Sequence, residues 1–221
     1  MQVFDNSGMH IHYLDEGDPN GAPLVFSNSL GTDMRLWDKI IPSLPKGLRI
    51  IRYDMRGRGL SDCRGAPYSM GDLISDVEAL LDHLNICGCF FVGLSIGGMI
   101  AQGLATKRLD LIRAMVLSNT ASKIATPAIW QDRIDSIRRT GICPVSDTTM
   151  SHWLSPKMRA SSTMSPWHNM MPATRPEGYI GCARAISVTD FIATTSTLQL
   201  PFMGIAADHD GSPPQAWSAR P

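Results

Sequence analysis

The chain has 221 residues, with 20 Lys and Arg against 20 Asp and Glu, so its formal net charge is zero, and 43% of its residues are hydrophobic. This balance and the lack of a basic block argue against a nucleic-acid binder, and the composition is too apolar for a disordered chain. At about 100–200 residues per domain, one domain with room for an insertion is expected.

Apolar patterning predicts the elements in chain order. Residues Met9–Leu14 alternate like a half-exposed strand, whereas Leu24–Phe26 is continuously apolar, as in a strand covered on both faces. Ser69 with Asp72 three residues later is a capping-box-like helix start, and apolar residues follow it at helical spacing. The predicted strands cover residues 9–14, 24–26, 48–53, 89–92, 114–118 and 202–206, and a second core helix covers residues 97–107.

Strands that alternate with helices in this way predict an α/β fold with a mostly parallel sheet and helices on both faces. Between residues 121 and 193 the pattern changes, because Pro, Met, Trp, Ser and Thr become frequent and no strand is predicted. Helical segments such as Trp130–Arg139 occur there instead. We interpret residues 121–193 as a helical cap insertion in a core made of residues 1–120 and 194–221.

Two features bear on the cellular compartment. The stretch Leu84–Thr106 has no charged residue and is long enough to span a bilayer, but its glycines and polar residues fit a buried strand, turn and helix better. The opening residues lack the basic start and apolar core of a signal peptide, so we expect reduced cysteines and a cytoplasmic protein. Cys87 and Cys89 have neither redox nor zinc spacing and are interpreted as buried structural thiols.

The segment Gly93–Gly97 is a Gly-x-Ser-x-Gly motif placed directly between a predicted buried strand and a predicted helix. In that context the tight turn holds Ser95 in a strained conformation and exposes its hydroxyl above the sheet. Gly93 and Gly97 leave room for the turn, and the Ile96 N–H at the helix start is available to a developing oxyanion. The alternative is a glycine-rich turn with an incidental serine, but the flanking strand and helix favour a nucleophile.

Two further loops follow predicted strands. Ser27–Gly31 ends an early strand where a second oxyanion donor is needed, and the Leu30 N–H is the candidate. Asp54–Ser61 is rich in glycine and arginine, but it matches neither the P-loop nor the dinucleotide-binding spacing.

Together these residues resemble the α/β-hydrolase family. Four segments are similar, more narrowly, to the 3-oxoadipate enol-lactonases, which act in the β-ketoadipate branch of aromatic-compound catabolism. The resemblance runs from Val3 to about Pro214 and includes the cap. The four segments are residues 28–33, 93–98, 129–134 and 177–182.

The resemblance implies hydrolysis of a lactone by a serine nucleophile, with no metal or cofactor. Ser95 would attack the lactone carbonyl, and the N–H groups of Leu30 and Ile96 would hold the oxyanion. Family members place the triad acid before a proline after the strand that follows the cap, which makes Asp210 the acid. Asp208 is interpreted as a solvated turn carboxylate.

The family places its catalytic histidine on a loop after one more strand, and this sequence shows no such loop in the eleven residues after Asp210. The adjacent His209 cannot easily be oriented by that acid while reaching Ser95. We therefore expect a core without its last strand and helix, and at most residual activity. Residues 215–219 can be encoded by codons that, when read one base out of phase, encode a plausible helix start for this family. Our hypothesis is therefore that a frameshift or a truncated gene model removed the last strand, the histidine and the last helix.

The lactone of this family carries a carboxylate, so a cation should line the pocket. Arg133 is the candidate for this cation, and Trp130 is the candidate for an apolar wall of the pocket. The alternatives, that Arg133 is an ordinary surface charge and Trp130 an ordinary core aromatic, remain equally open. Two other functions also remain open: a non-catalytic protein that binds a small carboxylate, and another carboxylic-ester hydrolase. The expected partner is a small molecule rather than nucleic acid or membrane, and the sequence does not determine the oligomeric state.

Overall fold

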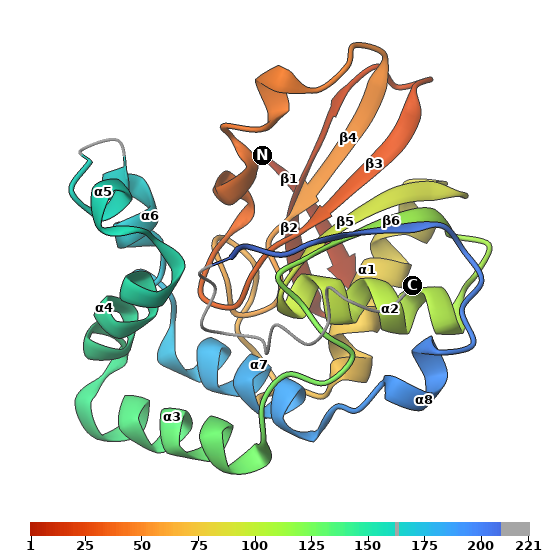
Figure 1. The fold of residues 1–221 in the computed structure, drawn as a ribbon. Helices are drawn as coiled ribbons and strands as arrows, with labels where there is room; N and C mark the ends of the chain where they lie inside the picture. Colours follow the sequence, from red (N-terminus) through yellow and green to blue (C-terminus); the bar gives the residue numbers. More distant parts are fainter. Residues whose placement is uncertain (162–163, 209–221) are drawn as a thin grey trace.

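A seven-stranded sheet forms the centre of the protein in the computed structural model, which describes residues 1–161 and 164–208 (Figure 1). The strand order across the sheet is β1-β2-β4-β3-β5-β6-β7. The strands are β1 Gln2–Asn6, β2 Met9–Gly17, β3 Ala22–Ser27, β4 Leu48–Tyr53, β5 Cys89–Leu94, β6 Ile112–Ser118 and β7 Phe202–Ile205.

The sheet is mostly parallel, as the sequence predicted. Strands β1, β2 and β4 pair antiparallel at one edge, whereas β4, β3, β5, β6 and β7 are parallel neighbours. All six predicted strands are present, and no end differs from the prediction by more than three residues; β1 is the strand that sequence patterning missed. Its residues Gln2–Asn6 pair with β2 through a tight hairpin at Ser7 and Gly8, where both φ angles are positive.

Two helices cover one face of the sheet. Helix α1 (Met70–His83) begins at the predicted N-cap, because the Ser69 hydroxyl accepts from the Asp72 N–H and the Asp72 carboxylate accepts from the Ser69 N–H. Helix α2 (Ile96–Lys107) is buried almost throughout and packs on β5, β6 and α1. Both helices contribute to the main hydrophobic core, together with the strand side chains that face them.

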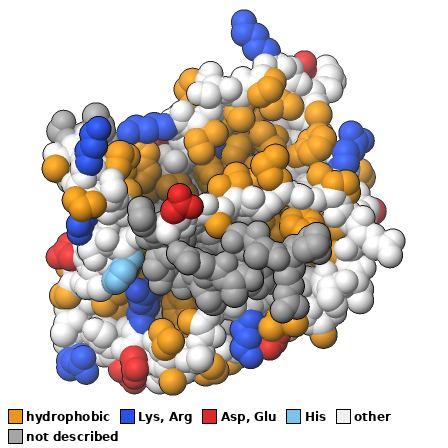
Figure 2. All heavy atoms as spheres, viewed as in Figure 1, with side chains coloured by type: hydrophobic (Ala, Val, Ile, Leu, Met, Phe, Trp, Pro, Cys, Tyr) orange, Lys and Arg blue, Asp and Glu red, His pale blue; other side chains and the backbone are white. Residues whose placement is uncertain are grey.

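The other face of the sheet carries a smaller cluster of Phe26, Trp37 and Ile50, covered by the 3-10 helices η1 (Met34–Trp37) and η2 (Ile41–Ser43). Figure 2 shows hydrophobic side chains gathered over this face of the sheet. The side chains of β7 are exposed along the whole strand.

The chain between β6 and β7 is helical in its described part and contains no strand there. Helix α7 packs against α3 and touches α1, whereas α8 packs against α2. The predicted helix at residues 130–139 is the greater part of α3. The helices of this segment are α3 Pro127–Thr140, α4 Ile142–Trp153, α5 Pro156–Arg159, α6 Ser165–Met170, α7 Pro176–Val188 and α8 Ile192–Thr195.

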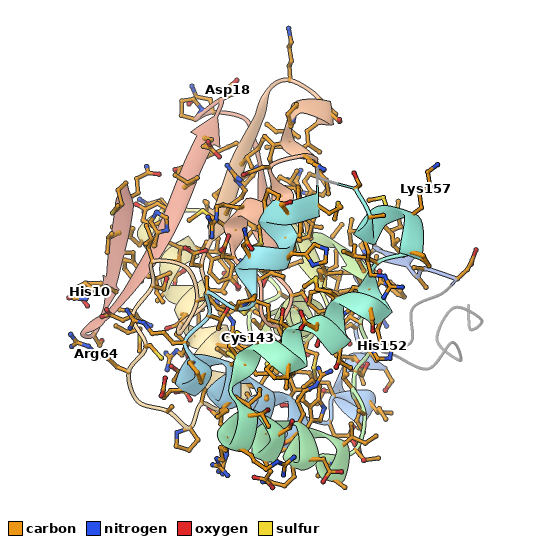
Figure 3. All side chains as sticks on the ribbon, turned by 90° about the vertical axis from the view of Figure 1, so that its left-hand side faces the viewer. His10, Asp18, Arg64, Cys143, His152 and Lys157 are labelled. Carbon is orange, nitrogen blue, oxygen red and sulfur yellow. The ribbon has the colours of Figure 1, made fainter. Side chains whose placement is uncertain are left out.

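The uncharged stretch of residues 84–106 divides into β5, a sharp turn and most of α2, as expected, and no helix among the described residues has the length and apolarity to cross a bilayer. All five cysteines are free. Cys89 is buried, but the interpretation of Cys87 as a buried thiol is wrong, because Cys87 is exposed before the strand begins. Cys143, at the start of α4, is exposed as well (Figure 3).

Candidate active site

The turn between β5 and α2 holds Ser95 in a conformation that non-glycine residues rarely adopt, with φ 55° and ψ −117°. The Ser95 N–H donates to the Ser118 carbonyl at 3.0 Å, and the Thr120 hydroxyl donates to the Ser95 carbonyl at 2.6 Å. The Ser95 side chain does not cap α2. Both backbone groups of this residue are therefore fixed by β6 and the loop after it, while the hydroxyl remains available.

The two motif glycines lie where no side chain would fit. A Cβ on Gly93 would lie 2.5 Å from the Gly97 carbonyl oxygen, and a Cβ on Gly97 would lie 2.2 Å from the Ser27 carbonyl oxygen. Real Cβ atoms do not approach backbone atoms so closely. The motif thus allows the start of α2 to pack against both β5 and the end of β3.

The loop after β3 places a second amide beside the turn. The Thr32 N–H and hydroxyl both donate to the Ser29 carbonyl, at 3.2 and 2.9 Å, which closes a tight turn around Leu30 and Gly31. Gly31 has φ 82°, and Leu30 is buried. Neither the Leu30 N–H nor the Ile96 N–H donates a hydrogen bond to any residue of the described part of the chain. Both amides are free to bind an anion.

A cavity of about 850 Å³ opens above Ser95. Four residues singled out in the sequence line it together, namely Ser95, Leu30, Trp130 and Arg133, and Ile96 follows Ser95 directly. They come from two loops at the carboxyl edge of the sheet and from α3, which is where ligands bind in open parallel sheets. The other described lining residues include Ser29, Thr32, Leu36, Asn119, Ile124, Ile129, His152, Trp153, Tyr179 and Asp208.

Trp130 and Arg133 lie on one face of α3. The indole N–H of the buried Trp130 donates to the Ile124 carbonyl at 2.7 Å, which fixes the ring as part of the wall. The Arg133 guanidinium lies 5.7 Å from the Trp130 ring and donates to the Tyr179 hydroxyl at 3.3 Å and the Thr149 hydroxyl at 3.4 Å. No carboxylate of the described part of the chain pairs with Arg133. Its charge remains available to a ligand.

Asp210, the predicted acid, lies outside the described residues, and so does His209. Asp208 is described, is exposed and lines the cavity. His152 on α4 also lines the cavity, and its Nδ1 donates to the Thr148 carbonyl at 2.8 Å, so a neutral ring carries its lone pair on Nε2 (Figure 3). Within residues 1–161 and 164–208, no histidine forms a hydrogen bond with Ser95.

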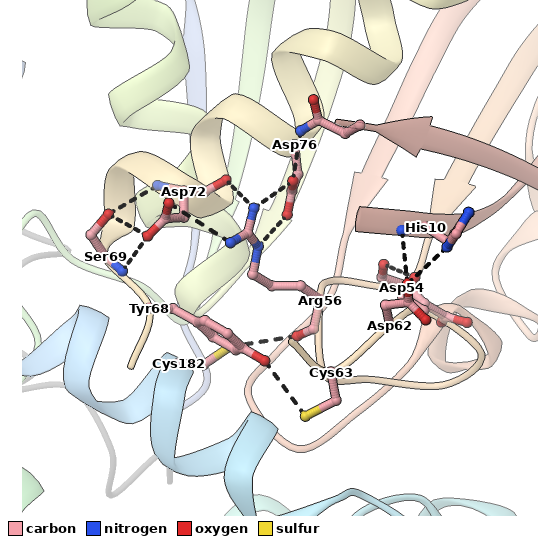
Figure 4. A network of polar contacts seen from close by, with 12 residues as sticks. His10, Asp54, Arg56, Asp62, Cys63, Tyr68, Ser69, Asp72, Asp76 and Cys182 are labelled. Carbon is pink, nitrogen blue, oxygen red and sulfur yellow. Dashed lines mark hydrogen bonds and ion pairs between the residues drawn. The ribbon is translucent and has the colours of Figure 1, made fainter. Parts of the chain in front are cut away.

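The glycine- and arginine-rich loop after β4 is held in place by buried polar contacts, part of which Figure 4 shows. Arg56 forms a bidentate pair with Asp76 of α1 at 2.6 and 2.7 Å, and His12 of β2 contacts the Asp54 carboxylate at 2.8 Å. A Cβ on Gly57 would lie 2.5 Å from the Cα of Gly178, so the loop and α7 are in backbone contact. The loop thus connects the sheet to the helices above the cavity.

Sequence reasoning missed three residues near the cavity. Tyr179 belongs to a segment that carried the family resemblance, but no pattern assigned its hydroxyl to the site. Arg58 belongs to the glycine- and arginine-rich loop, which matches no phosphate-binding spacing, and the structure buries it to 1% exposure beside Tyr179. His152 had no spacing relationship to Ser95, because α4 reaches the cavity only through the tertiary fold.

Comparison with known proteins is consistent with this geometry. Residues 22–139 match the family model described as alpha/beta hydrolase fold. The chain is 32% identical over 202 residues to 3-oxoadipate enol-lactonase 2 of Acinetobacter baylyi, covering 90% of this chain and 76% of that protein. It is 28% identical to 3-oxoadipate enol-lactonase 1 of the same organism, covering 95% of this chain and 79% of that protein. The crystal structure of the enol-lactonase from Burkholderia xenovorans superposes with a TM-score of 0.89 at 31% identity, covering 93% of this chain and 80% of that one.

Proposed function

The chain belongs to the α/β-hydrolase family, and from this premise we propose that it hydrolyses the enol-lactone of 3-oxoadipate to 3-oxoadipate. The observation that carries the proposal is the half-buried Ser95 on a strained turn, lining a cavity that Arg133 also lines. The enol-lactonase relatives align over nearly the whole chain, including the helices between β6 and β7. This reaction belongs to the β-ketoadipate pathway of aromatic-compound catabolism, and we propose that it takes place in the cytoplasm.

In the proposed mechanism, Ser95 Oγ attacks the lactone carbonyl and transfers its proton to a base. The N–H groups of Leu30 and Ile96 stabilise the tetrahedral oxyanion, because both amides are fixed before substrate binds. Collapse of this intermediate breaks the ring C–O bond, and the base returns the proton to the leaving oxygen. The product is a single acyl-enzyme whose acyl chain carries the enol. The enol tautomerises to the ketone, and water hydrolyses the acyl-enzyme to release 3-oxoadipate. The steps use no metal or cofactor.

We propose Asp210 as the acid of the triad by resemblance to the family. The base is the open part of the mechanism, because no histidine in the described part of the chain contacts Ser95. Serine without a paired base is a weak nucleophile, although the oxyanion hole and substrate binding alone can give about 10³–10⁴-fold catalysis over water. We therefore expect the 221-residue polypeptide to turn over the lactone slowly.

The substrate has a free carboxylate at the end remote from the reacting carbonyl. Arg133 is the proposed contact for it, since its guanidinium lines the cavity and pairs with no carboxylate of the described residues. The Trp130 ring would pack against the methylene carbons of the substrate. This arrangement would favour carboxylate-bearing lactones over neutral ones.

Assay of the purified protein with the enol-lactone of 3-oxoadipate tests the proposal, with Ser95→Ala as the matched variant. We expect hydrolysis above the buffer rate in the unchanged protein. An unpaired serine adds little to what the oxyanion hole and substrate binding supply, so Ser95→Ala should lower this rate by less than about tenfold, whereas a fall of about a hundredfold or more would show that a base activates Ser95. Hydrolysis at the buffer rate in the unchanged protein would contradict the proposed function.

A second candidate is a protein that binds a small carboxylate without catalysis. The lack of a histidine contact to Ser95 among the described residues favours it, while the strained turn favours an enzyme. Calorimetry with 3-oxoadipate beside the hydrolysis assay separates the two, because binding without turnover identifies the binder. Turnover of simple esters but not of the lactone would indicate a different carboxylic-ester hydrolase.

A further inference from the structure

Arg58, in the loop after β4, has a buried side chain in which two of the three guanidinium nitrogens lack hydrogen-bond partners. The residue is 1% exposed, and its Nη1 donates to the Gly57 carbonyl at 3.4 Å. Its Nε and Nη2 are buried and have no hydrogen-bond partner. Burying such a charge without compensation is costly, so an orphaned guanidinium requires an explanation.

Two other arginines with little exposure are compensated. Arg52 pairs with Glu16 and Asp38, and Arg56 pairs with Asp76 in a bidentate geometry. Arg58 forms no ion pair with any carboxylate of the described residues. The fold thus supplies a counter-charge to its structural arginines but not to this one.

Arg58 and Arg133 converge on the same side chain, Tyr179. The Arg58 guanidinium carbon lies 5.3 Å from the Tyr179 ring centroid, while Arg133 Nη1 donates to the Tyr179 hydroxyl oxygen at 3.3 Å. Because that oxygen accepts from Arg133, the phenol proton can be donated elsewhere. Burial raises the pKa of Tyr179 against the opposing effect of the two arginine charges, so the phenol keeps its proton at neutral pH.

Tyr179 connects this buried charge to the cavity. Tyr179 and Arg133 both line it, whereas Arg58 lies behind the tyrosine and is closed to solvent. Two cations therefore act on one wall, and no acidic partner among the described residues neutralises either of them. Asp208 is the acidic residue among the described lining residues, and its charge would direct an anionic ligand away from itself.

We propose that Tyr179, Arg133 and the buried Arg58 form an anion-binding wall that holds the terminal carboxylate of an acyl substrate, with Arg58 as a positioning residue behind Tyr179. A carboxylate would accept hydrogen bonds from Arg133 and from the Tyr179 hydroxyl. The charge of Arg58 acts across the ring in a region of low dielectric, where it is poorly screened. The selectivity for substrates with a carboxylate rests on the proposed hydrolase function, but the binding of a dicarboxylate does not.

Two esters with six-carbon acyl chains test the selectivity. One is 4-nitrophenyl hydrogen adipate, which ends in a carboxylate, and the other is 4-nitrophenyl hexanoate, which ends in a methyl group. We expect Arg58→Met to lower the ratio of kcat/KM for the charged ester to that for the neutral ester about tenfold, mainly through KM, as loss of about 1.4 kcal/mol of charge attraction would. Arg58→Lys should recover part of the ratio, because it keeps the charge.

Calorimetry with adipate measures the affinity of the anion-binding wall for a dicarboxylate without any catalysis. Affinity should fall about tenfold in Arg58→Met, and about three- to tenfold in Tyr179→Phe, which loses one neutral hydrogen bond and keeps the ring. Arg139→Met removes an equal charge from the exposed face of α3 and should leave adipate affinity unchanged. If neither ester is hydrolysed by any of these proteins, the proposed function fails. The adipate titration still tests whether the anion-binding wall exists.

Three results would overturn the proposal. The first is wild-type adipate affinity in Arg58→Met, and the second is an equal loss in Arg58→Lys and Arg58→Met, which would indicate a role in packing rather than charge. The third is unchanged adipate affinity in Tyr179→Phe, which would overturn the proposal even if Arg58→Met does not fold.

Discussion

Gly97 lies against Ser27 so closely that a Cβ on the glycine would come within 2.2 Å of the serine carbonyl oxygen. This contact brings the first turn of α2 to the end of β3. As a result, the loop that carries Leu30 and the turn that carries Ser95 border the same cavity. The spacing of the two proposed oxyanion donors depends on the absence of a single methyl group.

Replacing Gly97 with Ala should therefore separate α2 from β3. We expect a loss of about 1–3 kcal/mol in the free energy of unfolding, the usual cost of overpacking, and a fall in hydrolysis larger than this stability change explains. Urea unfolding and initial rates measure the two effects. Gly204→Ala is the control, because no atom lies within 4 Å of a Cβ at that position. Equal behaviour of the two variants would contradict the close contact.

Arg133→Met should weaken the binding of 3-oxoadipate. Charge-assisted hydrogen bonds contribute about 1.5–3 kcal/mol, so we expect the dissociation constant from calorimetry to rise about ten- to a hundredfold. Arg139→Met, on the exposed side of the same helix, supplies the comparison. If both variants bind as the wild type does, the carboxylate does not contact α3.

Ser69→Ala should destabilise the start of α1. The substitution removes the hydroxyl that accepts from the Asp72 N–H, and loss of an N-cap costs about 1 kcal/mol. In a chain of this length that corresponds to a fall in Tm of about 2–4 °C by calorimetry. Ser43→Ala, at an exposed serine that ends η2, should leave Tm unchanged. A Tm equal to wild type in Ser69→Ala would show that the cap contributes nothing.

Thiol alkylation should follow exposure. Cys87 and Cys143 are exposed and should react with iodoacetamide first, followed by the partly buried Cys63. Cys89 and Cys182 are buried, and burial raises the pKa of both thiols, so little of the reactive thiolate forms. Peptide mass spectrometry reads the order of labelling, and in urea all five should react alike. Early labelling of Cys89 in the native protein would place β5 at the surface.

Stability should decrease at alkaline pH. Burial raises the pKa of the Cys89 thiol to about 12, from an ordinary value of 9.0, and raises those of Tyr53 and Tyr179. Above the ordinary values the unfolded chain releases protons that the folded chain retains, so the stabilisation present at lower pH is lost as pH rises. The free energy of unfolding from urea titrations should therefore be constant near pH 8 and fall between pH 9 and 10.5. A constant value over that range would argue against burial of these groups.

Local patterns were sufficient to predict most of the fold. Strands such as Leu48–Tyr53, the N-cap at Ser69 and the sharp turn at Ser95 depend on residues close together in the chain, so the sequence predicts them. The strand β1 was missed because its residues show no apolar alternation. Cys87 was misplaced because it lies before β5, where strand patterning does not predict burial.

For the candidate site, the sequence alone determined the motif residues Ser95 and Ile96 and the loop at Leu30, because a strained turn leaves a signature of glycines at fixed spacing. Only the tertiary structure could decide that Arg58 is buried behind Tyr179, that Arg133 donates to that same tyrosine, and that His152 reaches the cavity. These side chains come from segments far apart in the sequence. Their meeting depends on how α3, α4 and α7 pack over the carboxyl edge of the sheet, and no local periodicity encodes that packing.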